Sequence, residues 1–375
     1  MDFDYAVVPA LILLVGIAIA SLSVRRILRL RNNAYPTWRI VIERIVLSIV
    51  VLFWVIVAGS AGYNAVALGW FRAHNPPPGD FYTVTGHRMH IYCAGSGWPT
   101  IVLDAGLGND ALIWGGVQPL LARTTRVCAY DRAGFGWSDA RPAPRDADHI
   151  ADDLHGLLAQ AKITGPIVLM GHSISGIYMR DYATRYTEGL AGIVFVDGST
   201  PMQQENPAFK KEMSKGPPQW VQLLIERSII DAGVPRLLGQ CSQKFVGFDA
   251  HASKLQAEDL CHPQLSAAMA EITSMDASGR ETIHSGPYGA LPILIFSQDP
   301  AKEGASMPAV ATAWNQMQED LKKLSTRSRR IIAKGSTHYI QLDRPELIEK
   351  EVPLFIQQVR GAAPEPTNYG STVTE

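Results

Sequence analysis

Residues 167–176 read Ile-Val-Leu-Met-Gly-His-Ser-Ile-Ser-Gly, an apolar run that ends in small residues around Ser173. This pattern predicts a nucleophile elbow, in which a buried strand turns sharply into a helix and holds a serine hydroxyl clear of its own backbone. The next amide, that of Ile174, then points to the place where an oxyanion would form. Serine in a glycine-rich turn is more often a simple turn former, so Ser173 needs partner residues elsewhere in the chain.

Two later strands supply those partners. An apolar strand over residues 331–333 is followed by His338, and another over 293–296 is followed by Asp299. A neutral imidazole can accept the serine proton, and a carboxylate fixes the tautomer of the imidazole and stabilises its cation. The order Ser, Asp, His along the chain is that of α/β-hydrolases. We therefore predict Ser173 as nucleophile, His338 as base and Asp299 as acid.

The segments between the strands have the pattern of helices. In residues 148–162, Ile150, Leu154, Leu157 and Leu158 recur at helical spacing and form one apolar stripe that can cover a sheet. Strands that alternate with such helices predict an α/β fold with a mainly parallel, doubly wound sheet. Ligands bind at the carboxyl ends of the strands in such sheets, and all three triad candidates are expected there.

Three further segments lead to a family resemblance. Residues 130–139 read Tyr-Asp-Arg-Ala-Gly-Phe-Gly-Trp-Ser-Asp after a strand, residues 195–199 read Phe-Val-Asp-Gly-Ser, and residues 338–345 run from His-Tyr-Ile to Asp-Arg-Pro. Together with the elbow, they make residues 80–360 resemble the α/β-hydrolase superfamily. The resemblance implies the fold of that family, its serine triad, and hydrolysis of esters or related acyl bonds. It implies no single substrate.

The resemblance leaves alternatives for the acid of the triad. Some relatives take this carboxylate from the loop after the strand that follows the elbow, and Asp197 occupies that position here. Glu303 is a third candidate, close to Asp299 in the sequence. We expect Asp299, and the kinetics of Asn variants distinguish it from Asp197.

The second oxyanion donor is expected from the loop after residues 101–103. We assign it to the amide of Leu107, with Gly106 beside the substrate. Two residues depart from the pattern of the family: Ala105 stands where many relatives have histidine, and Ser175 stands where the elbow usually has glycine. Because serine is small, we expect the turn to form.

Residues 200–286 interrupt the alternation of strands and helices. They lie between the strand after the elbow and the strand that leads to Asp299, and they contain several helical pieces. We interpret this insertion as a lid that walls the acyl pocket and excludes water. Trp220, Leu223 and Met269 are expected to line the pocket, although the small core of a lid would use the same residue types.

Two N-terminal segments, residues 6–24 and 45–68, are apolar and long enough to cross a ~30 Å hydrocarbon layer as helices. Between them the charges are mostly positive, and positive residues stay on the cytoplasmic side of a membrane. This predicts a cytoplasmic membrane protein whose hydrolase domain is periplasmic or extracellular. The charged residues between the segments are Arg25, Arg26, Arg29, Arg31, Arg39 and Arg44, with Glu43. The expected parts are an anchor (1–74), a proline-rich linker (75–80), a hydrolase domain (80–360) and a flexible tail (361–375).

All four cysteines follow the second apolar segment, so they are expected in an oxidising space where disulfides persist. Cys241 and Cys261 both lie in the predicted lid and would close a loop of about 20 residues. In the sheet order of the family, Cys93 and Cys128 fall on neighbouring strands, so the resemblance implies that they can pair too.

The sequence predicts a membrane-anchored serine hydrolase that cleaves a small-molecule carboxylic ester and has the lipid bilayer as its other partner. Amide, peptide or carbon–carbon bond hydrolysis with the same triad is an alternative, and so is a non-catalytic ligand sensor. We expect no cofactor and, because the histidines lack metal-ligand spacing, no metal. The net charge of −1 suggests no nucleic-acid partner, and no protein partner is predicted.

Overall fold

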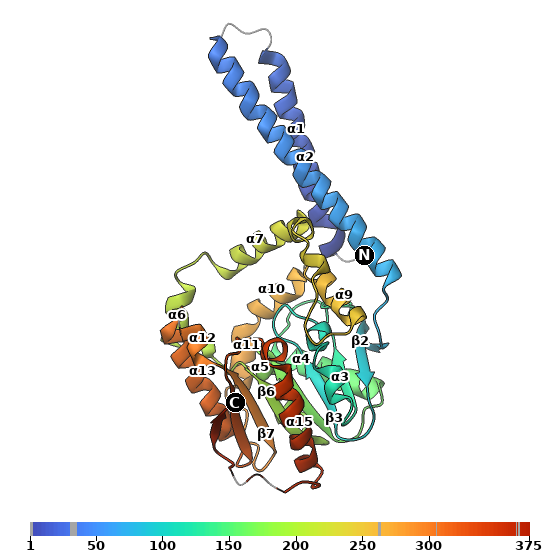
Figure 1. The fold of residues 1–375 in the computed structure, drawn as a ribbon, viewed down its shortest axis with the longest axis vertical. Helices are drawn as coiled ribbons and strands as arrows, with labels where there is room; N and C mark the ends of the chain where they lie inside the picture. The colour runs from blue at the N-terminus through green and yellow to red at the C-terminus, as the bar shows by residue number, and fades with distance from the viewer. Residues whose placement is uncertain (1–2, 31–35, 262–263, 305, 365, 367) are drawn as a thin grey trace. The chain divides into compact units, whose positions relative to one another are not determined.

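The computed structural model describes residues 3–30, 36–261, 264–304, 306–364, 366 and 368–375 (Figure 1). The chain divides into two compact units. The first, called here the anchor unit, comprises residues 1–76, 220–244 and 257–265. The second, called here the hydrolase unit, comprises residues 77–219, 245–256 and 266–375.

The hydrolase unit is built on a nine-stranded sheet with the order β1-β2-β4-β3-β5-β6-β7-β8-β9. Strand β2 pairs antiparallel with β1 and β4, and all other neighbours are parallel, which confirms the predicted mainly parallel sheet. The strands are β1 Asp80–Val84, β2 His87–Ala94, β3 Thr100–Asp104, β4 Val127–Tyr130, β5 Ile167–His172, β6 Leu190–Val196, β7 Ile293–Gln298, β8 Ser328–Ala333 and β9 Thr372–Thr374.

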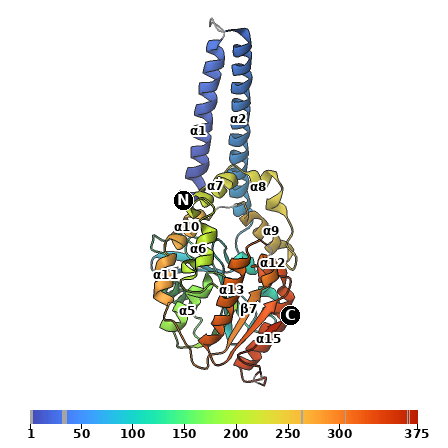
Figure 2. The same cartoon turned by 90° about the vertical axis from the view of Figure 1, so that its left-hand side faces the viewer.

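Helices cover both faces of this sheet, as Figures 1 and 2 show. Successive residues of a strand point to opposite faces. In β5, Val168 and Met170 belong to the core with α15 (Pro345–Val359), whereas Leu169 belongs to the core with α4 (Ala147–Gln160) and α5 (Ser175–Arg185). Because helices cover both faces, the central strands are continuously apolar. Polar side chains can reach a substrate only at the carboxyl ends of these strands.

Short helices complete the hydrolase unit. They are η2 Ala111–Trp114, α3 Gln118–Leu121, η3 Gln203–Glu205, α6 Pro207–Met213, α10 Leu265–Thr273, α11 Met275–Thr282, α12 Pro300–Gly304, α13 Pro308–Asp320, η5 Leu321–Leu324 and α14 Ile340–Asp343. Helix α9 (Ala250–Asp259) begins in the hydrolase unit and ends in the anchor unit.

The C-terminal segment expected as a flexible tail contains the last strand of the sheet. Strand β9 pairs parallel with β8, and the amide of Glu375 donates to the carbonyl of Ile332 at 3.0 Å. Its Thr-Val-Thr sequence is rich in β-branched residues, which suit a strand. Residues 372–374 therefore extend the sheet at its β8 edge.

The sheet contains the predicted disulfide between Cys93 and Cys128. The two residues are direct partners in the antiparallel register of β2 and β4, and their sulfur atoms are bonded. The second predicted pair, Cys241 and Cys261, is also bonded and lies in the anchor unit. All four cysteines of the chain are thus in disulfides.

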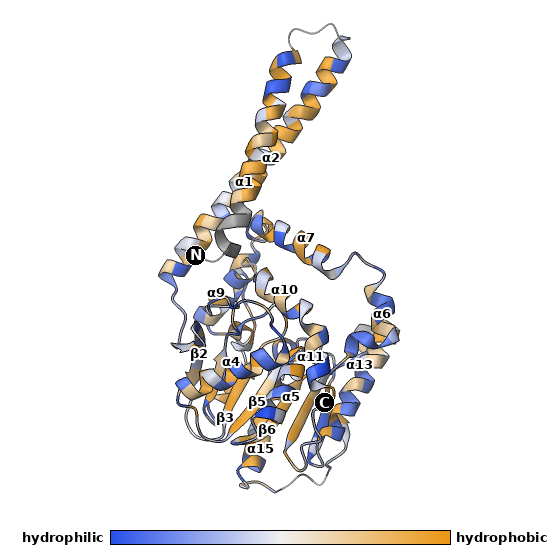
Figure 3. Ribbon diagram, turned by 180° about the vertical axis from the view of Figure 1, so that it is seen from behind, coloured by the Kyte–Doolittle hydropathy of each residue, from blue (hydrophilic) through white to orange (hydrophobic). Residues whose placement is uncertain are grey.

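The anchor unit begins with two long helices, α1 (Phe3–Arg29) and α2 (Thr37–His74), which pack against each other. Both are long and apolar enough to cross a membrane, by length and composition. Figure 3 shows apolar residues along most of both helices and polar residues near the connection between them. The predicted segments 6–24 and 45–68 lie within these helices; Arg31 lies outside the described residues.

The predicted lid is divided between the two units. Helices α7 (Gln219–Asp231) and α8 (Val234–Leu237), the 3-10 turn η4 (Gln240–Ser242) and the end of α9 belong mainly to the anchor unit. Helices α6, α10 and α11 belong mainly to the hydrolase unit. The insertion predicted over residues 200–286 is therefore distributed over both units.

Candidate active site

Ser173 lies at the tip of a tight turn between β5 and α5. Its φ of +56° is in the left-handed region, which L-residues other than Gly, Asn and Asp seldom adopt. The turn is held from the neighbouring loop, because the carbonyl of Ser173 accepts from the amides of Gly176 at 2.9 Å and Ser199 at 2.7 Å. The predicted strand–turn–helix therefore forms, with the Ser173 side chain at its apex.

Two glycines make this turn possible. A Cβ on Gly176 would lie 2.6 Å from the carbonyl oxygen of Ser199, and a Cβ on Gly171 would lie 2.0 Å from Oγ of Ser175. The space that Gly171 leaves open is therefore filled by the side chain of Ser175. Its hydroxyl donates to Asp104 at 2.6 Å, which explains why the turn tolerates serine where relatives usually have glycine.

His338 follows β8 and reaches Ser173, as the sequence predicts. Its Nε2 lies 2.9 Å from Oγ of Ser173. The backbone of this loop is held on both sides of the histidine. Nε2 of His172 donates to the carbonyl of His338 at 2.9 Å, and Asp343 accepts from both the amide and the hydroxyl of Thr337 at 2.7 and 2.6 Å. The imidazole is one-third exposed, so a substrate can approach it.

The carboxylate on His338 is that of Asp197, which directly follows β6. Its Oδ2 lies 2.6 Å from Nδ1 of His338, and its side chain is fully buried. Its other oxygen accepts from the amide of Gln298 at 2.9 Å and from Nε1 of Trp314 at 3.0 Å. Both oxygens of the buried carboxylate are therefore hydrogen-bonded, as a buried charge requires.

The expected contact between Asp299 and His338 is wrong, and the alternative, Asp197, takes the place of Asp299. Asp299 uses its oxygens for the local backbone: Oδ2 accepts from the amide of Gly335 at 2.8 Å, and Oδ1 accepts from Ala301 at the start of α12 at 3.0 Å. These two hydrogen bonds lower the pKa of Asp299 below its usual value. The carboxylate is thus a loop and helix cap. The side chain of Glu303 lies outside the described residues.

Trp314 is a site residue that the sequence analysis missed. It lies in α13, donates to Asp197, and places its ring edge-on to the imidazole of His338 with 5.6 Å between centroids. A tryptophan inside a helical pattern gives no signal that it contacts a loop carboxylate far away in the sequence. It fixes the orientation of both groups.

The second histidine of the elbow is buried and differs from His338 in its surroundings. Burial lowers the pKa of His172 well below its usual value, and the nearby imidazole of His338 lowers it further. His172 therefore stays neutral, and its Nε2 is engaged by the His338 carbonyl. This residue supports the loop that carries His338.

The loop after β3 approaches the elbow closely. A Cβ on Gly106 would lie 2.6 Å from Nδ1 of His172 and 3.3 Å from Cβ of Ser173, so glycine is needed there. Among the hydrogen bonds of the described residues, neither the amide of Leu107 nor that of Ile174 acts as a donor. These two N–H groups are therefore free for a ligand oxygen.

A buried arginine holds this loop in place. Nη1 of Arg132 donates to the carbonyl of Ala105 at 2.5 Å, and Nη2 donates to that of Gly106 at 3.0 Å. The same guanidinium pairs with Asp104 at 2.8 Å and with Glu271 of α10 at 2.7 Å. Although burial opposes its charge, the carboxylates of Glu271 and Asp104 raise the pKa of Arg132 above its usual value. Arg132 thus connects β3, the loop and α10.

Arg132→Met is expected to destabilise the hydrolase unit by about 3–5 kcal/mol, because Glu271 and Asp104 would remain buried without their partner. Urea unfolding of the solubilised protein measures this. Adding Glu271→Met should restore part of the loss. At temperatures where Arg132→Met is folded, kcat should still fall about 10–100-fold with little change in KM, because the loop carbonyls lose their donors.

The control is Arg88→Met, which breaks the exposed ion pair with Asp139. It should cost less than about 1 kcal/mol. Equal destabilisation by the two variants, or an unchanged kcat in folded Arg132→Met, would contradict the role given to Arg132.

The predicted pocket residues are distributed over both units. Gly106 lies against the elbow, and Met269 lies in α10 of the hydrolase unit. Trp220 and Leu223 lie in α7 of the anchor unit. Within the described ranges, no group of three or more His, Cys, Asp or Glu side chains is arranged to hold a metal ion.

A sequence profile described as the alpha/beta hydrolase family matches residues 101–351. The chain belongs to the α/β-hydrolase family. This region includes the elbow, the loop after β3, Asp197 and His338, so the site described above lies within the part of the chain that the family shares.

Curated relatives of this α/β-hydrolase include two uncharacterised proteins. One, from Schizosaccharomyces pombe, is 34% identical over an alignment of 153 residues that covers 33% of this chain and 29% of the relative. The other, YqjL from Bacillus subtilis, is 26% identical over an alignment of 275 residues that covers 71% of this chain and 87% of that protein. The chain thus spans less than a third of the yeast relative.

Solved structures with a similar fold include hydrolases of several kinds. An enol-lactonase from Burkholderia xenovorans LB400 has a TM-score of 0.53 at 20% identity, over 74% of this chain and all of that one. A thermophilic esterase from Thermogutta terrifontis has a TM-score of 0.53 at 20% identity, over 74% and 97%. A bacterial membrane phospholipase A has a TM-score of 0.56 at 20% identity, over 85% and 100%. At these identities the likeness concerns the fold.

Proposed function

We propose that this α/β-hydrolase is a serine hydrolase that cleaves carboxylic esters through an acyl-enzyme, with Ser173 as nucleophile, His338 as base and Asp197 as acid. One observation carries the proposal. Oγ of Ser173 is 2.9 Å from Nε2 of His338, whose Nδ1 is 2.6 Å from the buried Oδ2 of Asp197. This continuous chain of hydrogen bonds is the arrangement that activates a serine hydroxyl.

In the first half of the reaction, Oγ of Ser173 attacks the carbonyl carbon of the ester while Nε2 of His338 accepts the hydroxyl proton. The carboxylate of Asp197 stabilises the imidazolium that results. The tetrahedral intermediate then expels the alcohol, which takes the proton from His338. In the second half, water attacks the acyl-enzyme with His338 again as base, and the carboxylic acid leaves.

The oxyanion of both tetrahedral intermediates needs donors that are already in place. The free amides of Leu107 and Ile174 supply them in this proposal. Arg132 holds the carbonyls of Ala105 and Gly106 and so fixes the orientation of the Leu107 peptide. Preorganised donors of this kind lower the barrier because they need no rearrangement when charge develops.

An ester substrate is the best-supported choice, since hydrolases named as an esterase, an enol-lactonase and a phospholipase A have the same fold. Membrane anchoring is part of the proposal: α1 and α2 cross the membrane, the arginines around their connection stay cytoplasmic, and the hydrolase unit is extracytoplasmic. Two disulfides support an oxidising compartment.

We expect a panel of chromogenic esters of graded acyl length to be turned over by the detergent-solubilised full chain. For one acyl group, kcat/KM for the ester should exceed that for the matched amide at least about 100-fold, because an alkoxide leaves more readily than an amide ion. A fluorophosphonate should abolish turnover in proportion to labelling. Preference for the amide would favour the peptidase alternative, and labelling without turnover of any ester would favour a ligand sensor.

A further inference from the structure

Part of the predicted lid packs directly on the second apolar helix. Gly233, which precedes α8, has a φ of +78°. A Cβ on this residue would lie 2.8 Å from the carbonyl oxygen of Ser60 and 3.2 Å from Cβ of Asn64, both on α2. Only glycine combines this conformation with so close an approach. The α7–α8 turn is thus in backbone contact with α2.

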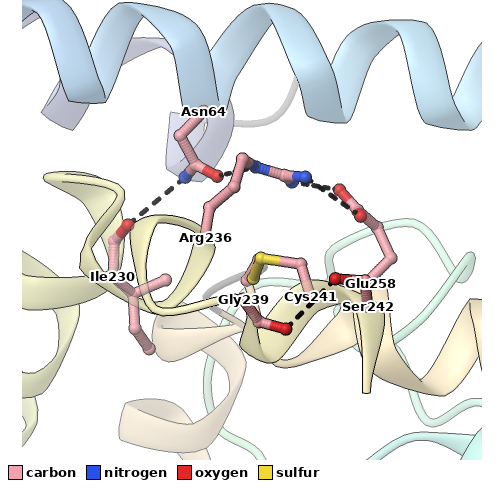
Figure 4. The surroundings of a disulfide bond; sticks show 8 residues. Asn64, Ile230, Arg236, Gly239, Cys241, Ser242 and Glu258 are labelled. Atoms are coloured by element: carbon pink, nitrogen blue, oxygen red, sulfur yellow. Dashed lines mark hydrogen bonds and ion pairs between the residues drawn. A yellow bond between two sulfur atoms is a disulfide. The ribbon is translucent and has the colours of Figure 1, made fainter. Parts of the chain in front are cut away.

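Polar side chains reinforce this contact, as Figure 4 shows. Nδ2 of Asn64 donates to the carbonyl of Ile230 at 3.3 Å, and Nε of Arg236 donates to Oδ1 of Asn64 at 2.7 Å. The same guanidinium pairs with Glu258 of α9. Asn64 and Glu258 are buried. Buried hydrogen bonds form only when donor and acceptor are in one relative position, so these contacts hold α8 in a defined position on α2.

A covalent bond completes the connection. The disulfide between Cys241 and Cys261 joins η4 to the segment just after α9, the helix that carries Glu258. The segments of the anchor unit taken from the predicted lid are therefore cross-linked to each other and hydrogen-bonded to α2. We name this assembly, residues 220–244 and 257–265, the docked cap.

The positions of the charged residues along α2 indicate how deep in the membrane the docked cap lies. Asn64 follows Arg44 by 20 residues without an intervening charge. At ~1.5 Å per residue this is about 30 Å, the thickness of the hydrocarbon layer. Exposed aromatic rings, which are enriched at membrane boundaries, lie near both ends of this stretch: Trp38 before it, and Tyr63 and Trp70 toward its end. The uncharged run continues to Phe71, so Asn64 lies toward its C-terminal end, close to one membrane surface.

The docked cap presents a large apolar surface at this level. In α7, Trp220, Leu224, Ile225 and Ile229 are all about half exposed and lie within about half of the helix circumference; Figure 3 shows apolar turns along it. At the end of α8, Leu237 and Leu238 are 61% and 69% exposed. A pocket of about 500 Å³ in the same unit has an apolar part, lined by Ile225, Ile229, Ile230, Pro235 and Leu260, and a polar part, lined by Gln222, Glu226 and Gln240. Exposed apolar side chains gathered in this way mark an interaction surface.

We propose that the docked cap inserts its apolar face into the membrane that α1 and α2 cross, at the leaflet on the Asn64 side, where phospholipid chains fill the pocket. The inference rests on the membrane anchoring of the proposed function. The two arginines of the docked cap are paired, Arg227 with Asp231 and Arg236 with Glu258. Its other charges are Lys244, Glu226 and Asp259, so the docked cap has no excess of positive charge and insertion is driven by apolar burial. Zwitterionic lipid is therefore sufficient, and anionic lipid is not required.

The test uses the full chain in phosphatidylcholine vesicles. Since the native cysteines are all in disulfides, an added cysteine can be labelled alone with an environment-sensitive dye. Leu238→Cys and Trp220→Cys report on the docked cap, Ile56→Cys reports on the middle of α2, and Leu354→Cys on α15 reports on the hydrolase unit. Lipids that carry a nitroxide near the headgroup or near the chain end then measure the depth of each dye.

We expect the headgroup nitroxide to quench the two cap dyes at least about twofold more strongly than the Leu354 dye, and the chain-end nitroxide to quench the Ile56 dye most. Asn64→Leu should reduce quenching of the Leu238 dye by at least half and leave that of the Ile56 dye unchanged. If the Ile56 dye is strongly quenched but the cap dyes are quenched no more than the Leu354 dye, the docked cap is not inserted in the membrane and the proposal is wrong. If the cap dyes are protected both from the lipid nitroxides and from aqueous iodide, protein covers the apolar face, and the proposal is again wrong. If the Ile56 dye is not quenched at all, the membrane anchoring of the proposed function is wrong.

Discussion

Asp197→Asn is expected to lower kcat/KM for an ester about 10⁴-fold, whereas Asp299→Asn should change it less than about threefold. The asparagine amide would face Nδ1 of His338 with an N–H or with a neutral oxygen. In the first case the imidazole takes the wrong tautomer, and in the second its cation loses the stabilising charge. The carboxylate of Asp299 accepts from the backbone amides of Gly335 and Ala301, and among the hydrogen bonds of the described residues it has none to His338. Initial rates of ester hydrolysis by the two purified variants show which of the two carboxylates is the catalytic acid.

A folding control is needed because Asp197 also accepts hydrogen bonds from Gln298 and Trp314. Circular dichroism and urea unfolding check that the variant keeps its fold. Trp314→Phe removes one of these hydrogen bonds but leaves the carboxylate, and should cost only about 10-fold in kcat. Near-parental activity of Asp197→Asn, together with a large loss in Asp299→Asn, would return the acid to the position expected from the sequence.

Ser173→Ala is expected to give the largest loss, about 10⁶-fold in kcat, with KM almost unchanged. The hydroxyl forms the covalent bond, and the remaining hydrogen-bond donors can bind a substrate but cannot attack it. His338→Ala should cost nearly as much, and the double variant should be no worse than either single variant, because the two groups act as one unit. Steady-state kinetics on the best ester of the panel measure all three.

The matched control is Ser214→Ala, which removes an exposed hydroxyl that donates to the carbonyl of Lys211 at the end of α6. It should keep full activity. A Ser173→Ala variant that retained more than about one per cent of turnover would contradict a mechanism that passes through this oxygen.

The positions of Ser173 and His338 could be predicted because each depends on a local pattern. An apolar strand that ends in small residues around Ser173 is typical of an elbow once a partner is found, and a histidine after a late parallel strand lies at the same edge of the sheet. The mainly parallel sheet followed from the alternation of apolar strands with helical stripes. Pairing of Cys93 with Cys128 followed from the neighbouring strands that the family resemblance implied.

The carboxylate that contacts His338 could not be predicted, because Asp197 and Asp299 both follow parallel strands and differ only in loop geometry. The backbone at Asp197 has a φ of +49°, and its side chain meets Trp314 from a distant helix. Asp299 instead faces the amides of Gly335 and Ala301. Neither contact can be predicted from the residues next to Asp197 or Asp299 in the sequence. Three-dimensional packing decides between two carboxylates that are equivalent as patterns.

The sequence also could not predict that part of the lid belongs to the anchor unit. Asn64 is one polar residue in a long apolar helix, and Arg236 is one of several arginines in the insertion. Their hydrogen bond couples segments more than 170 residues apart. Long-range pairs of this kind become visible only when the chain is folded, whereas the two apolar helices themselves were evident from length and hydropathy.

The most direct test of the proposed mechanism is to trap the acyl-enzyme. The full-length protein is mixed with a slowly deacylating aryl ester, quenched with acid within milliseconds to seconds, digested and measured by mass spectrometry. The mechanism predicts the mass of the acyl group on Ser173, with a time course that follows the burst of released phenol, and no adduct in Ser173→Ala. Burst turnover without an adduct on Ser173, or an adduct on another residue that forms at the same rate, would contradict it.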